Sequence, residues 1–372
     1  MKYYLIAGEA SGDLHGSNLL RELKKLDPDA HVRAWGGELI QEQGAHIVKH
    51  YRDLAFMGFA EVVMNLRTIL RNISFCKEDI LKFRPDAIIL VDYPGFNLRI
   101  AEFAHENKIK VFYYISPQVW AWKQSRVKKI RQVVDKMMVI LPFEKDFYKK
   151  FDYEVDFVGH PLLDAIEQQK DKLLAVNSWK KKAGLSEKPL IGLLPGSRTQ
   201  EISKILPLML TVVDKLPEYQ FAIAAAPSQP LTYYKSLIGD KNIPVIADET
   251  YSLLSASEAA LVTSGTATLE TALLNIPEVV CYKGGKISYH IAKRIVDIKY
   301  ISLVNLIMDR EVVKELIQDD LNEETIFAEL KKVLTPEHRS KLLADYSELR
   351  TKLGGSGASE KAARIIFENM EK

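Results

Sequence analysis

The sequence has few cysteines, no long apolar run and almost no net charge. Only Cys76 and Cys281 occur among 372 residues, so a disulfide framework and a structural zinc site are both disfavoured, and a reducing cytoplasm is the expected compartment. The 51 Lys and Arg residues against 49 Asp and Glu give a net charge of +2, far from the basic excess of a nucleic-acid-binding protein. The longest uncharged stretch, residues 219–234, contains two prolines, whereas a membrane-spanning helix needs about 20 mostly apolar residues. A soluble chain of two domains is expected at this length.

Short apolar runs alternate with amphipathic stretches along nearly the whole chain. In the first half they cover residues 3–7, 32–35, 87–91, 111–115, 137–141 and 155–158. In the second half they cover residues 190–194, 221–226, 244–247, 259–262 and 279–282. Continuous apolar strands separated by helices are typical of parallel sheets covered on both faces. The pattern therefore predicts an α/β fold of two consecutive Rossmann-like, doubly wound domains that face a cleft.

A charged stretch without a strand pattern, residues 165–188, separates the two halves. We therefore predict an N-terminal domain over residues 1–163 and a C-terminal domain over residues 164–335. The remaining residues, 336–372, are predicted to form two helices interrupted by the glycines at 354–357. These helices either pack back on the N-terminal domain or are exchanged with a partner, which leaves a homodimer open.

Loops that follow the strands carry the candidate chemistry, because ligands bind at the carboxyl ends of parallel strands. The first such loop, GEASGD (residues 8–13), has neither the Lys-Ser/Thr of a P-loop nor the glycine spacing of a dinucleotide fingerprint. Glu9 and Asp13 would also repel a pyrophosphate. Either the loop faces a ligand, or Ser11 or Asp13 caps the following helix.

The loop VDYPGFN (residues 91–97) places Asp92 directly after an apolar strand. A partly desolvated carboxylate at this position has a raised pKa, as a general base requires. The alternative is that Asp92 or Asn97 caps the next helix.

Two segments have the character of a lipid-facing surface. Residues 116–131 (SPQVWAWKQSRVKKIR) combine indoles with cations, which suits an anionic lipid surface, although a solvated helix with packed indoles has the same composition. The residues concerned are Trp120, Trp122, Lys123, Arg126, Lys128 and Lys129. FMGFAEVV (residues 56–63) is either buried core or an exposed patch for acyl chains. Its apolar members are Phe56, Met57, Phe59, Val62 and Val63.

The second half contains two candidate anion sites. LLPGSR (residues 193–198) offers Arg198, whose guanidinium matches phosphate oxygens, with Glu201 in place to orient it. In SGTATLE (residues 264–270), backbone amides at a helix start and the hydroxyls of Ser264, Thr266 and Thr268 are expected to converge on an anion, and Glu270 to reach a ribose. Together they fit a diphosphate. No metal site or cofactor is predicted.

Taken in order, these motifs resemble those of the lipid-A-disaccharide synthase family over nearly the whole chain. The segments that carry the resemblance are GEASGD, VDYPGFN, SPQVWAW, LPFEK (141–145), PGSR, SGTATLE and SLVNL (302–306). The resemblance implies the two-domain glycosyltransferase B architecture. It also implies an inverting, metal-independent transfer of 2,3-diacylglucosamine from UDP to the 6-hydroxyl of 2,3-diacylglucosamine 1-phosphate (lipid X). It further implies a peripheral enzyme at the inner membrane of Gram-negative bacteria.

The resemblance also implies roles for individual residues. Asp92 takes the catalytic position, with Glu9 and Ser11 in the loop beside it. UDP-sugar contacts are implied for Arg198, Glu201, Ser264, Gly265, Thr266, Ala267, Thr268, Glu270 and Asn305, and a lipid contact for residues 56–63. The alternatives are a UDP-GlcNAc 2-epimerase, a peptidoglycan glycosyltransferase and a non-catalytic nucleotide-binding regulator. The two lipid-facing segments favour an acylated acceptor over an epimerase substrate.

Overall fold

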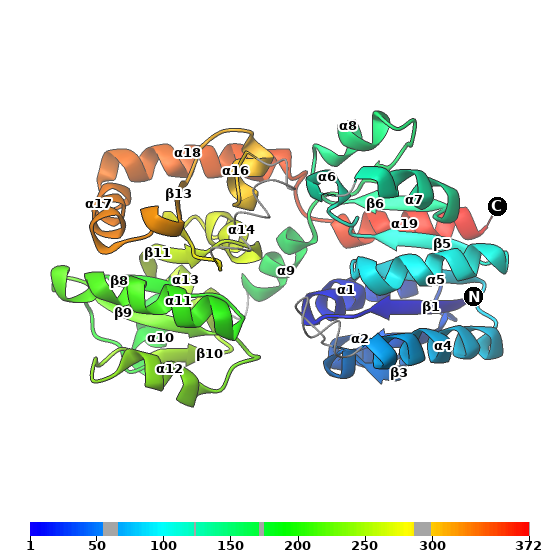
Figure 1. The fold of residues 1–372 in the computed structure, drawn as a ribbon, viewed down its shortest axis with the longest axis horizontal. Coiled ribbons are helices and arrows are strands. Elements are labelled where there is room, and N and C mark those ends of the chain that lie inside the picture. The colour runs from blue at the N-terminus through cyan, green and yellow to red at the C-terminus, as the bar shows by residue number, and fades with distance from the viewer. Residues whose placement is uncertain (55–65, 123, 171–174, 286–298, 372) are drawn as a thin grey trace. The chain divides into compact units, whose positions relative to one another are not determined.

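The computed structural model describes residues 1–54, 66–122, 124–170, 175–285 and 299–371 (Figure 1). The chain divides into two compact units. Unit 1 comprises Met1–Asp164 together with Leu353–Lys372, and unit 2 comprises Ala165–Lys352. The last two helices therefore belong to different units: α18 (Pro336–Lys352) to unit 2 and α19 (Ala358–Met370) to unit 1. One alternative predicted from the sequence is that both helices pack on the N-terminal domain, but α19 alone lies in that unit.

Unit 1 contains a seven-stranded parallel sheet in the order β3-β2-β1-β4-β5-β6-β7. The strands are β1 (Lys2–Ala7), β2 (His31–Gly36), β3 (His46–His50), β4 (Ala87–Val91), β5 (Lys110–Tyr114), β6 (Lys136–Val139) and β7 (Asp156–Phe157). The helices are α1 (Ala10–Leu26), α2 (Glu38–Glu42), α4 (Leu66–Phe83), α5 (Pro94–Glu106), α6 (Val119–Trp122), α7 (Val127–Val133), α8 (Glu144–Lys149) and α9 (Pro161–Lys170), which continues into unit 2. Two 3₁₀ turns, η1 (Tyr51–Leu54) and η2 (Gln124–Arg126), complete the unit.

The central strands of this sheet are buried on both faces, which explains their continuous apolar sequence. In β1, Tyr4 and Ile6 belong to one apolar core, and Tyr3 and Leu5 belong to the other. The first core also includes side chains of α4 and α5, and the second includes side chains of α1 and α19 (Figure 1). The sheet is thus covered on both sides, as the sequence predicts.

The C-terminal helix α19 completes unit 1 through a buried carboxylate. The backbone amides of Gly357 and Ser359 donate to Asp164 Oδ1 and Oδ2 at 2.6 and 2.9 Å. These amides lie at the start of α19, where no intrahelical acceptor is available to them. Asp164 therefore caps the helix, and α19 packs along α1.

Unit 2 contains a six-stranded parallel sheet in the order β10-β9-β8-β11-β12-β13. The strands are β8 (Leu190–Leu194), β9 (Gln220–Ala225), β10 (Val245–Ala247), β11 (Ser257–Thr263), β12 (Glu278–Tyr282) and β13 (Lys314–Ile317). The helices are α10 (Val176–Lys182), α11 (Thr199–Met209), α12 (Leu231–Ile238), α13 (Thr250–Ser255), α14 (Thr266–Leu273), α16 (Leu303–Met308), α17 (Glu323–Val333) and α18, with 3₁₀ turns η3 (Leu210–Lys215) and η4 (Gln318–Asp320). Both sheets have the Rossmann-like doubly wound order, so the predicted fold class is confirmed.

Two edge strands, β3 and β13, are absent from the apolar runs of the sequence. Both lie at the edge of a sheet and are only partly buried. Their sequences, HIVKH and KELI, therefore mix charged and apolar residues and give no continuous hydrophobic pattern. Within the described ranges, no helix is both long enough and apolar enough to cross a bilayer.

Candidate active site

The candidate catalytic residues of unit 1 lie where the strand order reverses. Strands β1 and β4 are neighbours, with Ala7 paired to Val91, and their following connections run to opposite faces of the sheet. Such a switch point is where open α/β sheets bind ligands. Glu9 and Asp92 follow these two strand ends directly. A Cβ atom on Gly8 would lie 2.4 Å from the Tyr93 ring, so only glycine lets the two loops approach this closely.

The backbone at Asp92 is held in a conformation that non-glycine residues rarely adopt. Asp92 and Tyr93 have φ values of 45° and 48°, both in the left-handed region. The Asp92 carbonyl accepts from Asn97 Nδ2 at 2.7 Å and from the Tyr113 hydroxyl at 2.6 Å, and its amide donates to the Tyr114 carbonyl at 3.0 Å. Strained backbone persists only where its surroundings hold it in place, and it is concentrated at functional sites.

The Asp92 carboxyl group is half-buried and has the electrostatics of a general base. Burial first, and then the charge of Glu9, raise its pKa from 3.8 to about 6, while the Tyr93 backbone amide opposes the rise. A pKa near the working pH is what a proton acceptor needs. The alternative that Asp92 or Asn97 caps α5 is wrong, because Tyr93 is the residue before the helix and no side chain caps it.

The GEASGD loop has a different arrangement from either capping alternative. Helix α1 follows Glu9 without a side-chain cap, and Ser11 is exposed in its first turn. The Asp13 carboxylate instead accepts from the amides of Gly37, Leu39 and Ile40 at 2.7, 3.1 and 3.2 Å. Asp13 therefore caps α2, and the prediction that Ser11 or Asp13 caps α1 is wrong.

In unit 2 the strand order reverses between β8 and β11, and the PGSR loop lies at this point. Gly196 adopts a φ of 110°, and a Cβ atom there would lie 2.8 Å from a Glu201 oxygen. Glu201 accepts from the Arg198 guanidinium at 3.1 Å and from the Ser197 amide at 3.3 Å. Arg198 is exposed, so Glu201 orients a guanidinium that solvent or a ligand can reach.

The SGTATLE loop offers backbone amides rather than a full set of hydroxyls. Thr268 is fully buried and its hydroxyl donates to the Gly265 carbonyl at 2.9 Å, while the Ser264 hydroxyl donates to the Ile301 carbonyl at 2.8 Å. The expectation that these two hydroxyls donate to an anion is therefore wrong. Gly265 and Thr266 are exposed, and the amides of Thr266 and Ala267, at the start of α14, precede its first hydrogen bond, which runs from the Thr268 amide to the Gly265 carbonyl at 3.2 Å.

Glu270 is one turn into α14 and is partly covered. The Tyr251 hydroxyl donates to Glu270 Oε1 at 3.0 Å. Burial raises the pKa of Glu270, and this hydrogen bond opposes the rise. Tyr251 thus orients the carboxyl group that the sequence predicts to bind a ribose.

Asn305 does not offer its side chain to a ligand, contrary to the role that the resemblance implied. It is fully buried, and its amide nitrogen donates to the Val313 carbonyl and to Glu315, both at 2.9 Å. Its amide oxygen accepts from the Val312 and Val313 amides at 2.8 and 3.0 Å. Asn305 therefore holds the segment around β13.

Part of the predicted lipid-facing surface lies outside the described residues. This applies to Phe56, Met57, Phe59, Val62, Val63 and Lys123, and to the side chain of Trp122. Trp120 is half-buried and its ring meets Phe143 edge-on at 5.0 Å. It therefore packs inside unit 1 and is not a projecting anchor. Lys128 and Lys129 are exposed, and Arg126 is half-buried.

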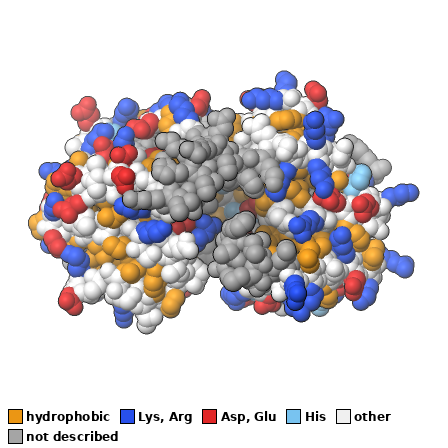
Figure 2. Space-filling view, viewed as in Figure 1, with side chains coloured by type: hydrophobic (Ala, Val, Ile, Leu, Met, Phe, Trp, Pro, Cys, Tyr) orange, Lys and Arg blue, Asp and Glu red, His pale blue; other side chains and the backbone are white. Residues whose placement is uncertain are grey.

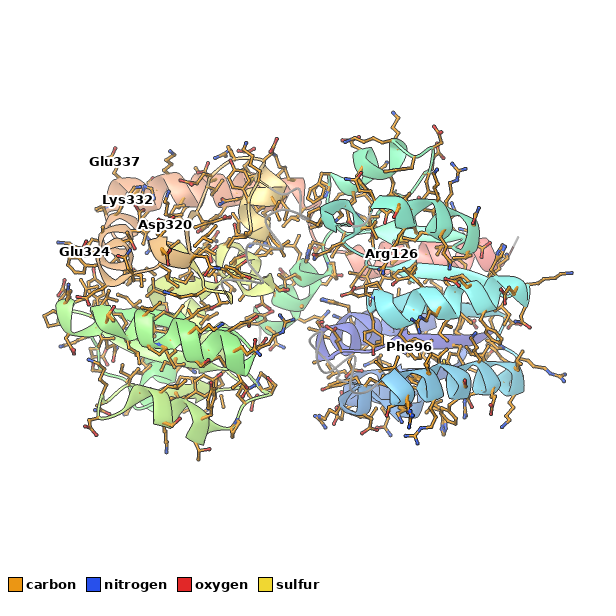
Figure 3. The ribbon with its side chains drawn as sticks, in the orientation of Figure 1. Phe96, Arg126, Asp320, Glu324, Lys332 and Glu337 are labelled. Atoms are coloured by element: carbon orange, nitrogen blue, oxygen red, sulfur yellow. The ribbon has the colours of Figure 1, made fainter. Side chains whose placement is uncertain are left out.

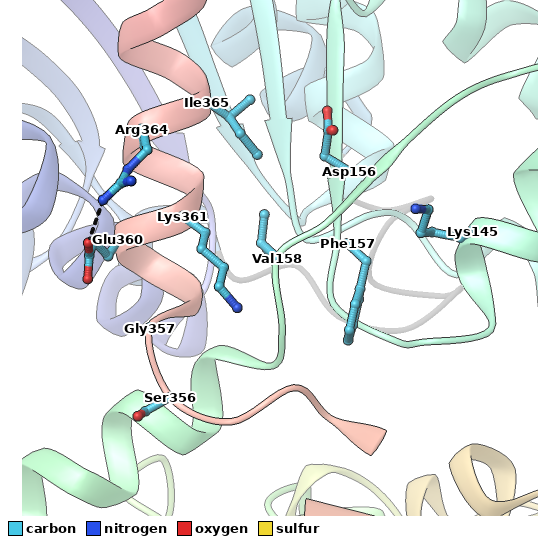
Figure 4. Close-up of a pocket in the computed structure, with 10 residues that line it drawn as sticks. All are labelled: Lys145, Asp156, Phe157, Val158, Ser356, Gly357, Glu360, Lys361, Arg364 and Ile365. Atoms are coloured by element: carbon cyan, nitrogen blue, oxygen red, sulfur yellow. Dashed lines mark hydrogen bonds and ion pairs between the residues drawn. The ribbon is translucent and has the colours of Figure 1, made fainter. Parts of the chain in front are cut away.

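A cavity of about 480 Å³ lies elsewhere in unit 1. It is lined by Lys145, the strand β7 region and the start of α19, where Arg364 pairs with Glu360 (Figure 4). None of its lining residues is a candidate site residue, and both basic and acidic side chains line it.

Sequence reasoning missed the residues that hold the site together. Tyr113, Tyr251 and Glu315 each bind a site residue or its backbone. Tyr113 lies in an apolar strand and its sequence neighbourhood is that of a core residue. Only the position of its strand beside β4 in the sheet brings its hydroxyl to Asp92.

Solved structures share this fold over the whole chain. UDP-GlcNAc 2-epimerase from Neisseria meningitidis, bound to UDP-GlcNAc, is 15% identical with a TM-score of 0.68, and the match covers 100% of both chains. The glycotransferase of kitacinnamycin is 14% identical with a TM-score of 0.64, and covers 99% of this chain and 98% of that one. The fold is therefore the one shared by sugar-nucleotide epimerases and glycosyltransferases.

Sequence comparisons show to which family of proteins with this fold the chain belongs. Residues 3–368 match the family model described as lipid-A-disaccharide synthetase. Lipid-A-disaccharide synthases from Syntrophus aciditrophicus (strain SB) and Geobacter sulfurreducens are 41% and 37% identical, each over 99% of this chain and 97% of the relative. The chain belongs to the lipid-A-disaccharide synthase family and is a glycosyltransferase of lipid A biosynthesis, as the resemblance implied.

Proposed function

We propose that this chain condenses UDP-2,3-diacylglucosamine with 2,3-diacylglucosamine 1-phosphate, and that Asp92 is the general base. The proposal is supported chiefly by the carboxyl group of Asp92 at the switch point of unit 1, on strained backbone and with a pKa near 6. Asp92 removes the proton of the acceptor 6-hydroxyl as its oxygen attacks the anomeric carbon. Glu9 keeps the pKa of this base high.

The departing UDP gains negative charge on its diphosphate, and unit 2 carries donors suited to that charge. Arg198 offers a guanidinium fork, and the first turn of α14 offers backbone amides from Gly265, Thr266 and Ala267. Fixed donors of this kind stabilise a leaving group without reorganisation. Glu201 orients Arg198, and Glu270 is proposed to bind the ribose.

The test is a transfer assay with UDP-diacylglucosamine and diacylglucosamine 1-phosphate, with and without a chelator. The expected product is the β-1′,6-linked disaccharide 1-phosphate with release of UDP in both conditions. Asp92→Asn is expected to lower kcat about 10²–10⁴-fold with UDP affinity unchanged. Epimerised UDP-sugar without any disaccharide, or UDP binding without turnover, would contradict the proposal.

We further propose that unit 1 associates peripherally with the cytoplasmic surface of the inner membrane. Helix α4 exposes Leu70 and Phe75, at 49% and 45%, beside the exposed Arg67 and Arg71. Figure 2 shows further Lys and Arg side chains over α7 and α8, and the exposed ones are Lys128, Lys129, Arg131, Lys145, Lys149 and Lys150. Apolar side chains among cations are suited to an anionic bilayer surface.

Flotation with vesicles tests this second proposal. The wild-type protein is expected to float with phosphatidylglycerol vesicles and less with phosphatidylcholine vesicles. Leu70→Glu with Phe75→Glu is expected to weaken flotation, whereas Leu231→Glu, which alters an exposed leucine of unit 2, is the matched control. Equal flotation of all three proteins would contradict the proposed surface. Sedimentation of the wild-type protein without vesicles reports whether the homodimer that the sequence leaves open forms.

A further inference from the structure

We propose that Arg126 binds the phosphate group of the acceptor sugar. This inference rests on the proposed function, in which the acceptor presents its 6-hydroxyl to Asp92 and carries a phosphate on C1 of the same sugar. The edge of unit 1 that receives this acceptor holds two carboxylates, Glu9 and Asp92, whose charges interact. An anionic acceptor therefore needs a cation nearby, separate from the base itself.

Arg126 lies at the end of unit 1 that carries the proposed base, and its charge is not among the influences on the pKa of that base. It ends the 3₁₀ turn η2 at the start of α7, which packs on α5. Figure 3 shows Arg126 and Phe96 at the same end of α5, the end that follows Asp92. The Tyr113 hydroxyl, which donates to the Asp92 carbonyl at 2.6 Å, also lies within electrostatic reach of the guanidinium.

The charge of Arg126 opposes the raised pKa of Tyr113, which burial dominates. It is not among the influences on the pKa of Asp92, which are burial, Glu9 and the Tyr93 amide. A guanidinium directly beside the base would lower the pKa of the base and weaken it. An arginine that binds the phosphate and not the base therefore suits a substrate whose reacting hydroxyl and phosphate are on different carbons.

Buried hydrogen bonds hold the segment that leads to Arg126. The Ser116 and Tyr148 hydroxyls are 2.7 Å apart, and Glu144 accepts from the amides of Ile140 and Leu141 at 3.2 and 2.9 Å. Burial raises the pKa of Glu144 to about 7, while these amides, Ser116 and Trp120 oppose the rise. The ends of β5 and β6 are thereby tied to α8, which gives η2 a rigid base.

The other cations near η2 differ from Arg126 in burial or in chemical type. Lys129 forms an ion pair with Glu102 on the side of α5, and Arg131 donates to the Phe151 carbonyl at 2.9 Å. Lys128 is exposed on α7. Arg126 is the half-buried one among these, and a guanidinium can bind two phosphate oxygens at once, which gives it more geometric selectivity than an ammonium group has.

The experiment compares two acceptors, diacylglucosamine 1-phosphate and the same sugar without phosphate, in neutral detergent micelles. The ratio of their kcat/KM values measures the contribution of the phosphate. Wild-type enzyme is expected to prefer the phosphorylated acceptor by about 10- to 100-fold, the range of a hydrogen bond to a charged group. Arg126→Gln is expected to bring the ratio close to one, and Arg126→Lys to an intermediate value. Lys82→Gln, at an exposed position in the last turn of α4, is the control and is expected to keep the wild-type ratio.

A wild-type ratio retained by Arg126→Gln overturns the inference, and so does a wild-type ratio of one. Absence of disaccharide from either acceptor with the wild-type enzyme overturns the proposed function instead, and this inference with it. Melting temperature and UDP affinity are measured for each variant. A variant that keeps both but loses the preference supports phosphate binding at Arg126 rather than a folding role, and Arg126→Lys provides the second variant if the Gln variant does not fold.

Discussion

Removal of the charge on Glu9 is expected to move the acid limb of the pH–rate profile to lower pH. Burial first, and then Glu9, raise the pKa of Asp92 from 3.8 to about 6. A general base is active when deprotonated, so wild-type kcat/KM is expected to rise with pH up to about 6 and then level off. Below that pH the deprotonated fraction, and with it the rate, falls about tenfold for each pH unit.

The size of the shift follows from the order of the two causes. Glu9→Gln keeps the shape of the side chain and removes its charge, but it leaves Asp92 half-buried. Because burial is the larger cause, the pKa of Asp92 is expected to fall by about one pH unit and not to return to 3.8. At about pH 5 the deprotonated fraction of Asp92 is then about one tenth in the wild-type enzyme and about one half in the variant. The kcat/KM of the variant, as a fraction of its own plateau value, is therefore about five times that of the wild-type enzyme.

The assay is kcat/KM between about pH 4.5 and pH 8 for the wild-type enzyme, Glu9→Gln and a control, Glu106→Gln. Glu106 is an exposed residue at the far end of α5, so its variant makes the same charge change away from Asp92. Coincident acid limbs for Glu9→Gln and the wild-type enzyme would refute the coupling of the two carboxylates. An unchanged limb in a residually active Asp92→Asn enzyme would show that another group titrates.

Three further outcomes are expected. Arg198→Ala should lose UDP-sugar affinity in calorimetry, because the guanidinium is the exposed cation of the unit 2 switch point; unchanged affinity would remove it from binding. Asp13→Ala should lower the free energy of unfolding by roughly 1–3 kcal/mol in urea, since three amides at the start of α2 lose their acceptor, whereas Asp29→Ala in an exposed turn should not. Burial raises the pKa of Glu278 well above 4.5, so the stability that its protonated form contributes is complete below pH 4.5 and declines as pH rises. Glu278→Gln should remove this decline. The same dependence of the free energy of unfolding on pH in both proteins would contradict this prediction.

The fold was readable from the sequence where strands are buried on both faces. Strands β4 and β8 coincide with the predicted runs at 87–91 and 190–194, because an interior parallel strand must be apolar at every position. Edge strands β3 and β13 escape this rule because one side of each faces solvent or polar side chains. These two edge strands therefore need the register of their neighbours before they can be recognised, whereas the edge strands β7 and β10 lie within the predicted runs at 155–158 and 244–247.

The sequence predicts which site residues follow a strand, but it does not predict where their side chains point. Position alone brings Glu9 and Asp92 together, since β1 and β4 are adjacent and parallel. It does not reveal whether a side chain turns outward, and Asn305 and Thr268 both turn inward to bind backbone groups. Asn and Thr form such local bonds readily, which makes them unreliable markers of a ligand contact.

The two switch points differ in charge in a way that suits the two halves of a glycosyl transfer. A base must keep a raised pKa, and among the described residues the influences on the pKa of Asp92 include no cation. A leaving diphosphate needs cations and amide donors, and these follow β8 and β11, where Glu201 orients Arg198. A guanidinium beside Asp92 would depress the pKa of this proposed base, and a carboxylate at the unit 2 switch point that was not paired with Arg198 would repel the diphosphate. Placing the two sets on separate sheets, each after its own pair of strands, meets both electrostatic requirements within one chain.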